Sequence, residues 1–75
     1  MVELLEYIAK SLVDNPDQVE VEQVEEEDII RLELRVAQED MGKVIGKQGR
    51  IAKAIRTVIK AATAKEKKKV IVEII

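Results

Sequence analysis

Two glycines spaced by two, Gly46 and Gly49, interrupt a helical pattern and limit what this chain can fold into more than any other feature. After them, residues 50–64 place apolar side chains on one face of a helix, at Ile51, Ala54, Ile55, Val58, Ile59 and Ala62. Before them, residues 41–45 are mostly apolar. Because glycine accepts a positive φ without steric cost, the pattern predicts a short helix over 41–45, a turn over 46–49 and a second helix over 50–64.

The rest of the chain predicts one more helix and three strands. Residues 2–13 have the apolar spacing of an amphipathic helix, and alternating side chains predict strands over 18–25 and 29–36. A short turn joins these strands as an antiparallel hairpin. Residues 70–75 predict a third strand, which the helical crossover would place parallel to the second. The predicted order is α-β-β-α-α-β, a single α+β domain over residues 1–75.

The formal net charge of −2 conceals opposite charges in the two halves of the chain. Residues 1–28 contain ten acidic side chains and one basic side chain, whereas residues 41–69 contain ten basic side chains and one acidic side chain. A local excess of this size creates a field that the whole-chain charge hides. The second half is therefore predicted to bind an anion.

The composition argues against several classes of function. The chain has no His and no Cys, which removes the commonest metal ligand and the usual general base. We interpret Asp40 as the N-cap of the helix over 41–45 rather than a catalytic acid. We therefore predict no enzyme, no catalytic residue, no metal, no cofactor and no small-molecule substrate. No apolar run reaches about 18 residues, which predicts no membrane span, and we expect a cytoplasmic location.

The residues around the two glycines fit one of three phosphate-binding patterns. A nucleotide-binding P-loop has four residues between its two glycines, whereas three separate Gly42 from Gly46, and Gln48 stands where the P-loop needs a hydroxyl. A dinucleotide-binding fingerprint has a different glycine spacing and follows a strand. The third pattern, V-I-G-x-x-G between two helices, fits in residue type, spacing and context. Lys47, Arg50 and the positive end of the following helix would then favour a sugar–phosphate backbone.

The segment Val44-Ile45-Gly46-Lys47-Gln48-Gly49 matches the KH motif, and the chain resembles a type II KH domain over essentially its whole length. Its size is similar to that of small stand-alone bacterial KH proteins of the KhpA (YlqC-like) family. The resemblance implies a three-stranded mixed sheet with residues 29–36 in the middle and the helices packed on one face. It also implies a single-stranded RNA-binding protein whose GxxG loop clamps the backbone of about four nucleotides.

The predicted RNA-binding residues lie on both sides of the GxxG loop. They are Lys43, Val44, Ile45, Gly46, Lys47, Gln48, Gly49, Arg50, Lys53 and Arg56. Lys47 and Gln48 occupy the variable positions of the loop, and the apolar Val44 and Ile45 would line the groove or support it. Lys53 and Arg56 would face phosphate, with a solvated helix face as the alternative reading.

Two questions of partner and role stay open at this point. The resemblance implies an RNA chaperone or small regulator linked to cell shape, acting as a homodimer or with a larger KhpB-like KH protein. The alternatives are a structural subunit that pairs with another KH protein and has little affinity of its own, or a single-stranded DNA binder. The lysines of residues 65–69 are equally compatible with solubility and with a second backbone contact.

Overall fold

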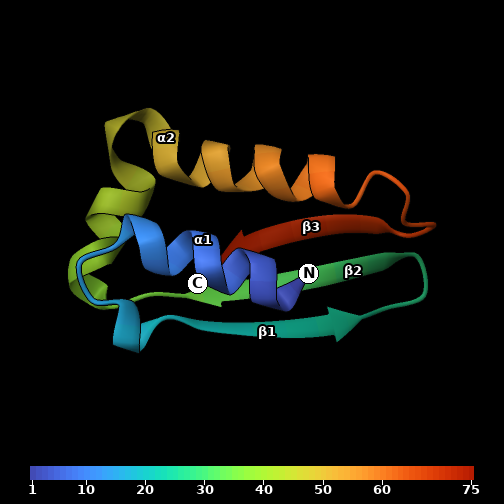
Figure 1. The fold of residues 1–75 in the computed structure, drawn as a ribbon, viewed down its shortest axis with the longest axis horizontal. Helices are drawn as coiled ribbons and strands as arrows, with labels where there is room; N and C mark the ends of the chain where they lie inside the picture. Colours follow the sequence, from blue (N-terminus) through green and yellow to red (C-terminus); the bar gives the residue numbers. More distant parts are fainter.

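The computed structural model describes residues 1–75, except for the side chains of Lys47 and Gln48. Its elements in chain order are α1 (Val2–Leu12), the 3-10 helix η1 (Pro16–Gln18), β1 (Glu20–Glu25), β2 (Ile29–Arg35), α2 (Gln38–Ala62) and β3 (Lys69–Ile74). The two helices predicted around the glycines are two parts of α2, whose direction changes sharply between them (Figure 1). The α+β class and the order α-β-β-α-α-β are confirmed.

The ends of the elements differ from the predicted ranges by at most three residues, and three of them agree. β1 begins at Glu20 rather than at residue 18, because Pro16–Gln18 forms a 3-10 turn in which the Val19 N–H donates to the Pro16 carbonyl at 3.2 Å. α2 begins three residues before the predicted residue 41, and ends at Ala62 rather than 64. Its C-cap Thr63 leaves the helical region with a φ of −110°.

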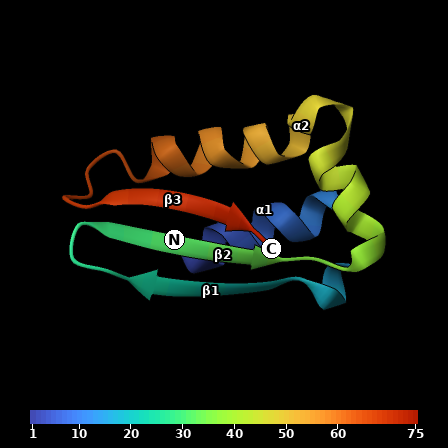
Figure 2. The ribbon, with the colours of Figure 1, turned by 180° about the vertical axis from the view of Figure 1, so that it is seen from behind.

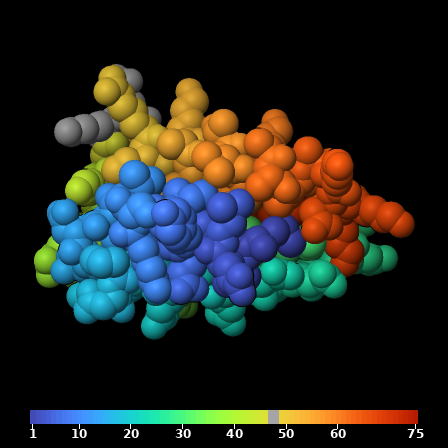
Figure 3. Space-filling model, viewed as in Figure 1, coloured from blue at the N-terminus to red at the C-terminus, as the bar shows by residue number. Residues whose placement is uncertain are grey.

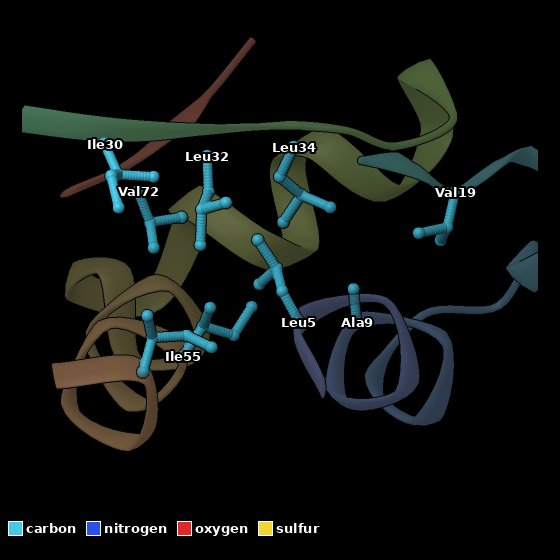
Figure 4. Close-up of a cluster of buried hydrophobic side chains, with 9 residues drawn as sticks. Leu5, Ala9, Val19, Ile30, Leu32, Leu34, Ile55 and Val72 are labelled. Atoms are coloured by element: carbon cyan, nitrogen blue, oxygen red, sulfur yellow. The ribbon is translucent and has the colours of Figure 1, made fainter. Parts of the chain in front are cut away.

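The sheet has the order β1-β2-β3, with β2 in the middle. β1 pairs antiparallel with β2, and β2 pairs parallel with β3, as the predicted hairpin and crossover require. Figure 4 shows α1 and α2 side by side beneath β2, and Figure 2 shows the strands in front of α1 from the opposite side. The sheet is therefore mixed, and both helices pack on one of its faces.

The core consists of aliphatic side chains from both helices and all three strand regions. β2 contributes Ile30, Leu32 and Leu34 on alternate positions, so all three point to the helix-covered face. They meet Leu5 of α1 and Ile55 of α2 in one cluster (Figure 4). On the surface, α1 and the later part of α2 lie side by side and hide most of the sheet (Figure 3). This packing makes α2 a rigid support for the loop that it contains.

Asp40 is not the N-cap that the sequence predicts. It lies inside α2, whose N-cap is Ala37, and its side chain is only 1% exposed. Its carboxylate accepts hydrogen bonds from the backbone N–H groups of Asp14 at 3.1 Å and Asn15 at 3.0 Å, and from the Asn15 amide at 3.2 Å. Asp40 therefore ties the connection after α1 to the start of α2.

The Asp40→Asn substitution is expected to destabilise the protein at neutral pH. Burial alone would raise the pKa of the Asp40 carboxyl, but the hydrogen bonds from Asp14 and Asn15 and the nearby Lys43 lower this pKa below its ordinary value of 3.8. Stability contributed by a carboxyl with a lowered pKa is present above pH 3.8 and is lost as the pH falls through the lowered pKa.

Thermal unfolding followed by circular dichroism from neutral to acid pH would check this expectation. The melting temperature of Asp40→Asn should lie below that of the unmodified protein at neutral pH, and the two should converge in acid. The exposed Asp17→Asn, in the neighbouring 3-10 helix, is the matched control. Equal melting temperatures for Asp40→Asn and Asp17→Asn at neutral pH would contradict a clamp at Asp40.

Candidate nucleic-acid interface

The turn predicted over residues 46–49 is centred on Gly49. Gly49 has a φ of +68°, whereas a right-handed helix has a φ near −63°. Helical structure continues on both sides, and Figure 1 shows that α2 changes direction here. Of the two glycines, Gly49 adopts the positive φ that glycine permits, whereas Gly46 stays within the first part of α2. We call residues 38–48 and 50–62 the first and second parts of α2.

The backbone at both glycines is open to a ligand. A Cβ placed at Gly46 or at Gly49 would have no heavy atom within 4 Å apart from its chain neighbours and the helix backbone. A side chain at Gly46 would therefore fit the fold and would occupy space that is open in this structure. At Gly49 a side chain would also be strained, because L residues disfavour the left-handed region.

Exposed basic side chains follow the turn along the second part of α2. Arg50, Lys53 and Arg56 are exposed, and the second part begins at Arg50, so the positive end of its dipole lies at the glycine turn. The Nε of Arg56 donates to the Val72 carbonyl of β3 at 3.4 Å, which directs this flank of the helix toward β3. Lys43 lies on the first part and forms an ion pair with Asp14 at 3.2 Å.

A groove of about 610 Å³ lies between the second part of α2 and β3. Its lining includes apolar side chains from both walls, Ile59 on α2 and Val70 and Val72 on β3. Its rim is basic, with Arg56, Lys60, Lys67, Lys68 and Lys69 and one acidic residue, Glu66. An apolar floor with a cationic rim suits a flexible polyanion that carries flat apolar groups, which is the chemistry of a single-stranded nucleic acid.

Of the predicted site residues whose side chains the structure describes, Arg56 is the one that lines this groove. Val44 is 0% exposed, so it supports the turn from the core and cannot line the groove. Ile45, the next residue, is 52% exposed beside the glycines. The side chains of Lys47 and Gln48, predicted to contact RNA, lie outside the described residues. Among the described residues the structure shows no group of side chains suited to a metal ion.

One wall of the groove was missed by sequence reasoning. Val70, Ile71 and Val72 form it from β3, and none was predicted as a site residue. The only signal was the short apolar run itself, which reads equally well as a buried strand. Which flank of β3 meets α2 depends on the crossover connection and on the pairing of β3 with β2, and neither is a local property.

No helix in the described chain combines the length and apolar character that a membrane crossing requires.

Comparisons with known proteins identify the family of this chain. The family model described as KhpA/KhpB, KH domain, matches residues 2–74. RNA-binding protein KhpA of Clostridium acetobutylicum is 73% identical over 75 residues and that of Caldanaerobacter subterraneus subsp. tengcongensis 68% identical, each covering 100% of both chains. RNA-binding protein KhpA of Aquifex aeolicus is 49% identical over 73 residues, covering 97% of this chain and 92% of its own. Comparison with solved structures gave no match. The chain therefore belongs to the KhpA/KhpB family of KH domains, as the sequence motif predicts.

Proposed function

We propose that this protein binds single-stranded RNA in the cytoplasm, as an RNA chaperone or post-transcriptional regulator without catalytic activity. The observation that carries the proposal is the left-handed turn at Gly49, which is open to a ligand and is followed by an exposed basic helix flank beside an apolar groove. Relatives that are 73% and 71% identical bear the name RNA-binding protein KhpA, which supports the same ligand.

The proposed mechanism divides the ligand between two surfaces. Phosphates lie against the backbone at Gly46 and Gly49, where the absence of side chains permits close approach, and against the charges of Arg50 and Lys53. The bases turn toward the groove between the second part of α2 and β3. There they contact apolar side chains and the free edge of β3, whose backbone groups can hydrogen-bond base edges.

Fluorescence anisotropy with labelled single-stranded RNA and DNA of the same sequence tests this function. The folded protein should bind RNA with an affinity that falls as salt rises, because binding releases counterions from the phosphates. Absence of RNA binding by the folded protein would contradict the proposal. Equal or tighter binding of DNA would instead favour the alternative of a single-stranded DNA binder.

The Lys53→Ala substitution is expected to weaken binding to all RNA sequences and to flatten its salt dependence. For single strands each phosphate contact contributes about 0.7 to the slope of log affinity against log salt, so this slope should fall by about that amount. Lys10→Ala is the matched control, because Lys10 lies on α1 and pairs with Glu6 at 2.8 Å. If the slope is unchanged in Lys53→Ala, Lys53 does not contact phosphate and the exposed flank of α2 is only a solvated surface.

We further propose that the protein acts as a homodimer or with a larger KhpB-like partner. The family description, which names KhpA and KhpB together, supports this, and large apolar side chains remain exposed on both helices at Leu4, Tyr7 and Val58. Two linked grooves would raise the apparent affinity by avidity. Size-exclusion chromatography with light scattering measures the molar mass and so distinguishes a monomer from a dimer. A dimer that binds no RNA would favour a structural pairing subunit.

A further inference from the structure

The acidic turn between β1 and β2 lies against the basic connection between α2 and β3. We define the acidic turn as residues 25–28 and the basic connection as residues 65–69. The Nζ of Lys68 donates to the backbone carbonyl of Glu26 at 2.8 Å and forms an ion pair with the Glu25 carboxylate at 3.5 Å. The N–H of Lys69 donates to the carbonyl of Asp28 at 3.3 Å. The two segments therefore form one end of the molecule.

This contact lies at the end of the groove farthest from the glycine turn. Lys68 and Lys69 both line the groove, and both are bonded to the acidic turn. The acidic turn is thus adjacent to the path that a strand would take if it continued beyond the second part of α2. From Arg50 to Thr63 this path measures about 20 Å, at roughly 1.5 Å per helical residue.

The helix flank that leads from the glycine turn to the groove is strongly basic, whereas the far end of the groove carries no net charge. At the glycine end, the exposed Arg50, Lys53 and Arg56 follow one another along the helix. At the far end, the basic connection has four basic residues and one acidic residue, and the acidic turn adds four acidic residues. Arg31, whose guanidinium pairs with the Glu26 carboxylate, brings the total at this end to five acidic and five basic residues, a formal charge of zero. Of the basic connection, the side chain of Lys68 is already paired with the acidic turn.

We propose that the acidic turn limits the RNA footprint, by holding Lys68 and repelling phosphates that would pass the end of the groove. This inference rests on the proposed function, because it concerns the length of RNA strand that the proposed binding groove accepts. The glycine turn and the second part of α2 bind a short strand of about four nucleotides. Phosphates beyond that length meet the carboxylates of the turn at short range, where repulsion outweighs any gain from the engaged lysines. The turn therefore determines ligand length and favours short single-stranded segments or loops.

The test compares a tetranucleotide with an octanucleotide of uridine on a variant with a neutral turn. Glu25→Gln, Glu27→Gln and Asp28→Asn together remove three charges and leave Glu26, whose carboxylate pairs with Arg31. The control variant, Glu3→Gln, Glu20→Gln and Glu22→Gln, removes the same charge from α1 and the start of β1. Circular dichroism establishes that each variant is folded, and fluorescence anisotropy measures the dissociation constants over a range of salt.

The unmodified protein and the control variant should bind the two oligonucleotides alike, within the twofold or so expected from the larger number of binding positions. The neutral-turn variant should bind the octanucleotide about three- to tenfold more tightly than the tetranucleotide, and its salt slope with the octanucleotide should increase by about 0.7 for each new phosphate contact. Equal ratios in the neutral-turn and control variants would overturn the inference but leave RNA binding intact. Absence of binding by every variant would overturn the proposed function, and this inference with it.

A second comparison identifies Lys68 as the residue that the turn holds. Lys68→Ala should weaken octanucleotide binding less in the unmodified protein than in the neutral-turn background, because the acidic turn already engages Lys68 in the unmodified protein. In the neutral-turn background the same substitution should remove most of the gain. An equal loss of affinity in the two backgrounds would show that the turn does not hold Lys68 away from RNA, and would contradict the inference. If the triple variant does not fold, Glu27→Lys replaces it, because it is a single change at an exposed position. It should also raise the affinity for the octanucleotide.

Discussion

Replacing Gly46 with Asp is expected to abolish single-stranded RNA binding while the protein remains folded. A Cβ at this position meets no heavy atom within 4 Å, so the fold has room for the side chain. The carboxylate would stand where the phosphates approach the backbone and would repel them. Hydrogen bonds to charged groups contribute roughly 1.5–3 kcal/mol each. Losing two of them weakens binding by on the order of a hundredfold or more.

Two further substitutions at Gly46 separate the charge from the volume of the new side chain. Gly46→Asn has nearly the size of Gly46→Asp without the charge, and Gly46→Ala adds the Cβ alone. Affinity should fall in the order Gly, Ala, Asn, Asp, with the largest step between Asn and Asp. Fluorescence anisotropy gives the affinities, and circular dichroism shows whether each variant is folded. If folded Gly46→Asp binds RNA as tightly as the unmodified protein, phosphates do not approach the backbone at Gly46.

Gly49 is a less suitable position for the same experiment, although the sequence treats the two glycines alike. Its φ of +68° costs an L residue about 1–2 kcal/mol, so Gly49→Asp combines loss of the ligand site with backbone strain. For a protein of 75 residues, total stability is only about 4–11 kcal/mol. Adding Gly49→Asp to Gly46→Asp should therefore lower the melting temperature. A further loss of RNA binding in the double variant would then not separate a damaged ligand site from a less stable fold.

Leu32→Ala is expected to cause the largest loss of stability among the substitutions considered. Leu32 is 0% exposed in the middle strand, and its register partner on β3 is Val72. In the core cluster it packs with side chains of both helices (Figure 4). Truncating a buried leucine costs about 2–5 kcal/mol, since the cavity adds to the lost burial. For a domain of this size the melting temperature should fall by roughly 10–30 °C.

Leu4→Ala supplies the control for this prediction, because it makes the same chemical change on α1 at a side chain that is 36% exposed. It should cost at most about 1 kcal/mol. Thermal and urea unfolding followed by circular dichroism would measure both. Similar losses for Leu32→Ala and Leu4→Ala would mean that the sheet is not packed as the structure shows.

The sequence predicts the elements well because their patterns are local. Alternation along β2 and the stripe along the second part of α2 depend on spacings of two to four residues, and both elements form where these patterns lie. The family membership follows from the glycine motif for the same reason, because the motif is a run of adjacent residues. The turn predicted over residues 46–49 lies within continuous helical structure, where Gly49 has a positive φ.

The roles of single residues were harder to predict. Asp40 has the residue type and position of a helix cap, but its carboxylate binds backbone N–H groups 25 and 26 residues earlier in the chain. Val44 belongs to the motif and is buried, whereas its neighbour Ile45 is exposed. Whether an apolar residue of a recognition motif faces the ligand or the core depends on how the helix sits on the sheet. The orientation of a helix on a sheet is set by tertiary packing, and a single sequence does not reveal it.

The sequence by itself determined the order of the elements, the place of the glycine turn, and the division of the chain into an acidic half and a basic half. Only the tertiary structure decided how those halves meet. The parallel crossover returns the chain so that β3 starts beside the turn that precedes β2, and Lys68 there reaches Glu26, 42 residues earlier. Part of the acidic half therefore borders the groove between α2 and β3. Charge counts along the chain could not reveal this, because electrostatic interactions depend on separation in space rather than in sequence.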